Sequence, residues 1–165
     1  MKKLSKISLV FTLLITLICT QFTGGISAKA ATEDQLGLKA AAAILLDAET
    51  GKILYEKNAD EVLGVASMSK MMTEYLVLEA IAEDKIAWDD EVLISEYVHN
   101  LSKGAGLSNI GLTQGETYTV KELYEAMAIF SANAATVALA EKVSGSETNF
   151  VKLMNKKAGE LGMKD

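Results

Sequence analysis

A serine and a lysine three residues apart, in Ser67-Met68-Ser69-Lys70, are the strongest candidates for catalytic chemistry in this chain. A serine hydroxyl needs a neighbouring base before it can attack a carbonyl carbon. The only histidine of the chain is His99, so the base that the sequence offers beside Ser67 is the lysine amine. Because three residues are close to one helical turn, a helix over this segment would place Ser67 and Lys70 on one face.

The surroundings predicted for this pair favour the same chemistry. Residues 67–83 have a helical pattern, so Ser67 is expected at a helix N-terminus, where free N–H groups and partial positive charge can hold an oxyanion. Desolvation, together with that positive end, would lower the pKa of Lys70 toward that of a general base. The simpler interpretation is that Ser67 only caps the helix and Lys70 is solvated.

A second group of candidates is Ser131-Ala132-Asn133, which interrupts two predicted helices, 120–130 and 134–143. A polar turn between apolar helices is surrounded by protein, so its hydroxyl and amide groups must find partners. The functional hypothesis is a serine that relays protons and an asparagine that hydrogen-bonds an amide substrate. The alternative is an ordinary Ser/Asn turn that caps the second helix.

Further patterns predict the elements that position these residues. The apolar run 40–47, a turn containing Gly51 and the run 52–56 predict a β-hairpin. Consecutive apolar residues in the first strand indicate burial on both faces. Thr119 and Glu122 form a capping box at the start of the 120–130 helix.

Two more helical patterns complete the prediction for the elements. In the helix over 67–83, one apolar stripe is expected from Met71, Tyr75, Leu78 and Ala82, with Met72, Leu76 and Glu79 beside it. A last helix begins at Ser146 with Glu147 and has apolar residues at a period of 3.6, with Gly162 placed as its C-cap.

The N-terminus has the features of an export signal, which we place at residues 1–30. Three early lysines precede the apolar run 7–18, and Ala28-Lys29-Ala30 supplies a small-x-small cleavage site. The apolar run is short for a membrane span, although a retained anchor is the alternative. The sequence therefore predicts an extracytoplasmic protein, in the cell wall or at the outer face of the membrane, with one domain over residues 31–165.

The charge balance excludes several classes of partner. Residues 1–30 hold four of the 16 basic residues and none of the 22 acidic ones, which leaves 12 against 22 and a net charge of −10. Nucleic-acid binding and electrostatic adhesion to anionic lipid both require a basic surface. Beyond residue 30 the chain has one histidine and no cysteine, so the sequence predicts no zinc site.

Together, the Ser-x-x-Lys and Ser-x-Asn patterns match two of the three motifs shared by serine penicillin-binding proteins and β-lactamases. The segments 46–55, 66–73, 131–135 and 145–155 resemble, in the same order, the low-molecular-mass D-alanyl-D-alanine carboxypeptidases, peptidase family S11. The resemblance covers nearly all of residues 31–165. It implies an α/β fold, a β-lactamase/transpeptidase-like sandwich with an all-α subregion.

The resemblance also implies roles for the site residues. Ser67 would attack the carbonyl between two D-alanines, Lys70 would accept its proton, Ser131 would assist proton transfer to the leaving D-alanine, and Asn133 would bind the substrate amide. The expected partners are peptidoglycan stem peptides ending in D-Ala-D-Ala, with β-lactams as acylating inhibitors. No metal or organic cofactor is expected.

The sequence departs from the family pattern after Asn133, where no Lys-Thr-Gly follows and no amphipathic membrane-tethering helix is found. We therefore expect residues 31–165 to be the N-terminal part of the catalytic domain, without its later sheet strands. The hairpin would then be marginal in water, with an exposed apolar edge. A polypeptide of this sequence alone is expected to fold poorly and to be nearly inactive.

Other interpretations of the sequence stay open. Among enzymes, they are a class A β-lactamase, which would need a deacylating glutamate in a later loop, or a transpeptidase. A non-catalytic, truncated wall-binding fragment is the alternative from another class. The last interpretation is a generic exported α/β domain in which the motifs occur by coincidence.

Overall fold

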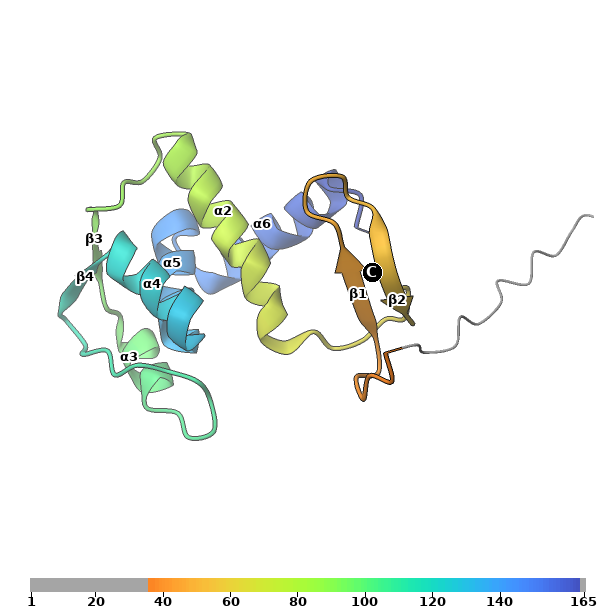
Figure 1. Cartoon of the computed structure of the whole chain (residues 1–165). Coiled ribbons are helices and arrows are strands. Elements are labelled where there is room, and N and C mark those ends of the chain that lie inside the picture. The colour runs from red at the N-terminus through yellow and green to blue at the C-terminus, as the bar shows by residue number, and fades with distance from the viewer. Residues whose placement is uncertain (1–35, 164–165) are drawn as a thin grey trace, which may run out of the picture. The chain divides into compact units, whose positions relative to one another are not determined.

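The computed structural model describes residues 36–163, which form two compact units that divide between Glu61 and Val62 (Figure 1). Each unit is described by itself. The predicted signal peptide, residues 1–30, lies outside the described residues. In the part of the chain that is described, no helix combines the length and apolar character needed to cross a membrane.

The first unit contains the predicted β-hairpin. Strand β1 (Ala43–Leu46) pairs antiparallel with β2 (Ile53–Lys57). The turn between them is closed by Asp47, whose Oδ1 accepts hydrogen bonds from the Thr50 N–H at 2.8 Å and from the Thr50 hydroxyl at 2.6 Å. Gly51 has a φ of 69°, a left-handed conformation that glycine adopts without steric cost.

The expectation that the first strand is buried on both faces is wrong for the described residues. Leu45 and Leu46 of β1, and Ile53 and Leu54 of β2, are each about half exposed. Among the described residues this sheet has only these two strands, so pairing satisfies the backbone groups that face the partner strand and leaves the side chains of both strands uncovered. The apolar run correctly predicted a strand but not its surroundings.

The second unit is mainly helical, with one short two-stranded sheet in which β3 and β4 pair antiparallel. Its elements in chain order are the 3-10 helix η2 (Ala66–Ser69), α2 (Lys70–Ala82), β3 (Glu91–Leu93), α3 (Glu96–Ser102), β4 (Thr117–Thr119), α4 (Val120–Phe130), α5 (Asn133–Ser144) and α6 (Glu147–Glu160).

Helix α5 is the centre of this unit and contacts α2, α3, α4 and α6 (Figure 1). Most of its buried side chains are small, which lets neighbouring helices pack closely against it. Its buried residues are Ala134, Ala135, Val137, Ala138, Leu139 and Ala140. The start of α5, which carries Asn133, is thereby fixed in the core.

The local signals for the two helix starts, at Thr119 and Ser146, are confirmed. Thr119 Oγ1 accepts from the Glu122 N–H at 3.1 Å, while Glu122 Oε2 accepts from the Thr119 N–H at 2.8 Å, which completes the capping box. Ser146 caps α6 by accepting from the Asn149 N–H at 3.2 Å. The predicted C-cap of α6, Gly162, is wrong by one residue: the C-cap is Leu161, and Gly162 follows with a left-handed φ of 76°.

The stripe expected on α2 does not form its buried face. Met71, Tyr75 and Leu78 are exposed in the described structure. The residues of α2 that are buried are Lys70, Thr73, Leu76, Val77 and Ala80. Apolar residues surround most of this helix, so the periodicity alone could not identify the face that packs against α5.

Candidate active site

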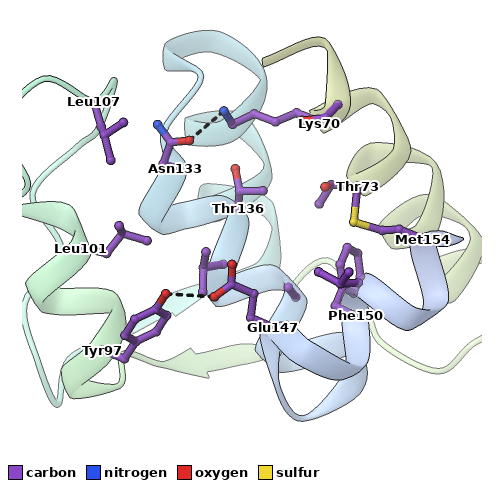
Figure 2. Close-up of a pocket in the computed structure, with 14 residues that line it drawn as sticks. Lys70, Thr73, Tyr97, Leu101, Leu107, Asn133, Thr136, Glu147, Phe150 and Met154 are labelled. Atoms are coloured by element: carbon purple, nitrogen blue, oxygen red, sulfur yellow. Dashed lines mark hydrogen bonds between the residues drawn. The ribbon is translucent and has the colours of Figure 1, made fainter. Parts of the chain in front are cut away.

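The amine of Lys70 connects the two motifs of the site. Its Nζ lies 3.1 Å from Ser67 Oγ and 3.1 Å from Asn133 Oδ1. Figure 2 shows the lysine side chain extending from α2 to meet Asn133 at the start of α5. Residues that are 63 positions apart in the chain therefore share one hydrogen-bonded group.

Ser67 reaches Lys70 through a 3-10 turn, not through the first turn of an α-helix as predicted. Ser67 lies in η2, and Lys70 is the first residue of α2. In a 3-10 helix the residues i and i+3 eclipse each other, which brings the hydroxyl and the amine together. Ala66, directly before the exposed Ser67, has a φ of 46°.

The electrostatic environment of Lys70 favours its neutral form. The residue is only 9% exposed, and burial lowers the pKa of its amine below the ordinary lysine value. Both of its hydrogen-bond partners in the described part of the chain, Ser67 and Asn133, are uncharged. No carboxylate is therefore hydrogen-bonded there to counteract the effect of burial.

Asn133 is held so that its carbonyl oxygen points at Lys70. Its Nδ2 donates to the Ser108 carbonyl oxygen at 2.9 Å, and its backbone N–H donates to the same oxygen at 3.0 Å. An amide oxygen can only accept, so Lys70 must donate to Asn133. When the amine is neutral, its lone pair is then available for the hydroxyl of Ser67.

The sequence did not reveal two residues that support this arrangement, Ser108 and Asn109. Asn109 Oδ1 accepts from the Ala134 N–H at 2.7 Å, and its Nδ2 donates to the Leu101 carbonyl oxygen at 3.0 Å. Both residues lie in the polar stretch 100–117, which contains four glycines and has neither helical nor strand periodicity. No local pattern marks a residue whose partner lies 25 positions away.

Ser131 lies at the turn between α4 and α5. It is the C-cap of α4, with a left-handed φ of 54°, and its backbone N–H bonds to the Ala126 carbonyl oxygen. Within residues 36–163, its half-buried hydroxyl makes no hydrogen bond, so the structure does not join it directly to Ser67 or Lys70. A hydroxyl without a partner is available to a bound molecule.

A pocket of about 280 Å³ adjoins this network. Lys70 and Asn133 lie at one end, and at the other the Tyr97 hydroxyl donates to Glu147 Oε2 at 2.9 Å (Figure 2). That hydrogen bond raises the pKa of Tyr97. Apolar side chains line the space between, among them Leu101, Val137, Phe150 and Met154. Among the described residues, no group of three or more His, Cys, Asp or Glu could hold a metal ion.

The model of the family described as D-alanyl-D-alanine carboxypeptidase, peptidase S11, matches residues 28–165. The chain belongs to this family. The resemblance inferred from the sequence is thereby confirmed. Among curated relatives, the D-alanyl-D-alanine carboxypeptidase DacF of Bacillus subtilis is 45% identical over 159 residues, which is 95% of this chain and 40% of that protein.

Solved penicillin-binding proteins have a similar fold. The structure of PBP3 from Streptococcus pneumoniae matches with a TM-score of 0.73 and 45% identity, over 76% of this chain and 35% of that one. Penicillin-binding protein D2 from Listeria monocytogenes, in its ampicillin-bound form, matches with a TM-score of 0.66 and 37% identity, over 79% and 50% of the two chains. The predicted α/β class is confirmed, and the chain spans half or less of the length of these relatives.

Proposed function

We propose that this S11 family member is an exported serine D-Ala-D-Ala carboxypeptidase that removes the terminal D-alanine from peptidoglycan stem peptides. The observation that carries the proposal is the Lys70 amine, placed 3.1 Å from both Ser67 Oγ and Asn133 Oδ1. The names of the curated relatives support the same activity.

In the proposed reaction, Ser67 Oγ attacks the carbonyl carbon of the penultimate D-alanine. Its proton passes to the neutral Lys70 amine, and the bond to the terminal D-alanine breaks to leave an acyl-enzyme on Ser67. The lowered pKa of Lys70 supports this step, because a general base works best when its pKa is near the operating pH. Water then cleaves the ester and releases the shortened peptide.

The second motif is assigned to substrate binding and proton transfer. One hydrogen of the Asn133 Nδ2 group remains after its bond to Ser108, and it can donate to the carbonyl oxygen of a substrate amide. The hydroxyl of Ser131 is proposed to relay the proton that Lys70 took from Ser67 to the nitrogen of the departing D-alanine, which leaves as the free amine while Lys70 returns to its neutral form. Its lack of a hydrogen-bond partner among the described residues supports that assignment.

The location of the enzyme follows from the same proposal. Residues 1–30 are assigned as a cleaved export signal, so residues 31–165 would act outside the cytoplasm, where stem peptides are found. The negative net charge of this region disfavours an anionic polymer such as nucleic acid as the substrate.

Substitution of the nucleophile tests the proposal. The substitution is made in the full protein that the gene encodes. Ser67→Ala should abolish covalent labelling by a fluorescent penicillin and D-alanine release from a peptide ending in D-Ala-D-Ala. Ser69→Ala is the matched control, since the Ser69 hydroxyl already donates to the Ala66 carbonyl oxygen at 2.9 Å. Labelling that persists in Ser67→Ala but disappears in Ser69→Ala would show that the nucleophile is misassigned.

The fate of the penicillin adduct distinguishes the proposed enzyme from a β-lactamase. The proposed carboxypeptidase is expected to form a stable adduct with penicillin on Ser67. Rapid multiple turnover of penicillin, followed by its absorbance, would instead favour a β-lactamase.

A further inference from the structure

A second pocket, of about 490 Å³, lies at the beginning of α4, away from the Ser-x-x-Lys motif in the sequence. Its lining residues are Trp88, Lys121, Tyr124 and Glu125. This volume falls in the range of about 300–1,000 Å³ that is typical of small-ligand sites. None of the residues takes part in the proposed reaction at Ser67.

The aromatic wall of this pocket is a fixed platform. The rings of Trp88 and Tyr124 pack edge to face, with centroids 5.2 Å apart and an interplanar angle of 85°. The Lys121 N–H donates to the Trp88 carbonyl oxygen at 3.0 Å, which ties the loop to the helix. Trp88 nevertheless remains 37% exposed, so a large aromatic surface faces solvent.

The charges at the rim restrict the ligand. Lys121 and Glu125 are both largely exposed, with Nζ and Oε1 3.9 Å apart. Because the lysine and the glutamate carry opposite charges close together, the rim has no net charge that would attract an ion of either sign. A neutral ligand with donors and acceptors can use both groups, and its C–H bonds can contact the negative faces of the aromatic rings.

We propose that the Trp88–Tyr124 pocket binds a sugar ring of an N-acetylated glycan strand. A pyranose offers C–H bonds on its face and hydroxyl groups at its edge, and its acetamido group is neutral and polar. The rim and the aromatic platform match these three features.

The pocket and Ser131 are connected by α4. The link drawn here between glycan binding and the reaction rests on the proposed function. Lys121 and Ser131 are both in or beside α4, ten residues apart, which corresponds to about 15 Å along a helix. An extended peptide of four or five residues spans about the same length. A strand bound at Trp88 would therefore carry a stem peptide long enough to reach Ser131, which the proposed function assigns to the reaction.

Calorimetric titration of the gene-encoded protein with a peptide-free β-1,4-linked tetramer of N-acetylglucosamine tests the proposal. We expect saturable binding that Trp88→Ala weakens by about tenfold or more, with labelling of Ser67 by fluorescent penicillin unchanged. Phe130→Ala, which removes an exposed aromatic ring from the other end of α4, is the control and should leave Kd unchanged.

The double substitution Lys121→Gln and Glu125→Gln provides an independent test. Both side chains are exposed, so the substitutions should not impair folding. It should weaken binding by about threefold or more. Absence of saturable binding to the parent protein, or an unchanged Kd in the double variant, would overturn the proposal. Binding of a glycan-free stem peptide at Trp88 in place of the tetramer would also overturn it. If penicillin does not label Ser67 in the parent protein, the proposed function is contradicted. The measured binding of the tetramer at Trp88 would still stand.

Discussion

Ser67 and Lys70 are joined within one turn of the chain, whereas Asn133 depends on a loop that lies 25 residues earlier. The first pair needs only the 3-10 geometry of η2 and the start of α2. Asn133 is oriented by the Ser108 carbonyl oxygen, which accepts from both its side chain and its backbone.

This difference separates the two tasks of the site. The serine and lysine supply the reacting groups, and their spacing in the sequence already brings them together. The loop residues supply orientation, since they decide which atom of the Asn133 amide meets Lys70. Substitutions of Ser67 or Lys70 should therefore abolish the reaction. Substitutions in the loop should mainly disturb the orientation of Asn133 and lower the stability of the fold.

The largest effect is expected from Lys70→Met, which keeps most of the buried volume and removes the base. The rate of Ser67 acylation by a β-lactam, measured by stopped-flow fluorescence, should fall by about 10³-fold. Lys157→Met is the control, because Lys157 is paired with Glu79 at 2.8 Å and that bond raises its pKa. Acylation at the parental rate in Lys70→Met would remove Lys70 from the reaction.

A smaller loss is expected from Ser131→Gly. Glycine is preferable to alanine here because Ser131 has a φ of 54°, so the turn is kept while the hydroxyl is removed. If this hydroxyl relays the proton to the leaving group, D-alanine release should slow by about 10²-fold with little change in the melting temperature. Unchanged release would leave Ser131 with only the structural role of ending α4.

Several features of this molecule could be predicted from local sequence alone. The capping box at Thr119 and the end of α4 at Phe130 are encoded by residues within a few positions of each other. The Ser67–Lys70 contact belongs to the same class, although its 3-10 geometry was not predicted. Each of these depends on short-range hydrogen bonds, which leave a pattern in the sequence.

The features that escaped prediction depend on distant partners. The buried face of α2 is selected by packing against α5, and apolar residues such as Met71 and Leu76 cannot be ranked without that neighbour. Asn109 is an ordinary loop residue until α5 places the Ala134 N–H beside it. Tertiary contacts of this kind have no periodicity and leave no local signal.

An intermediate effect, visible mainly in the pH profile, is expected from Asn133→Asp. The new carboxylate would lie about 3 Å from the Lys70 amine, favour its charged form and raise its pKa. In the parent protein, acylation should increase with pH and reach its midpoint below 10.5, the ordinary lysine value. In Asn133→Asp, the midpoint should move to higher pH and the rate at neutral pH should fall by about tenfold. A midpoint that stays in place would show that the two side chains do not interact in solution.

The smallest effect on activity, and the most informative about orientation, is expected from Asn109. Asn109→Ala removes the acceptor for the Ala134 N–H, so it should lower the free energy of unfolding by about 1–2 kcal/mol and slow acylation a few-fold. Asn109→Asp is the matched variant, because it keeps the acceptor and places a negative charge near the N-terminus of α5, which the helix dipole favours. Urea unfolding should show Asn109→Asp close to the parent protein and Asn109→Ala clearly weaker. If both variants lose the same stability, the bond from Asn109 to the Leu101 carbonyl oxygen, and not the cap on α5, holds the loop against the site.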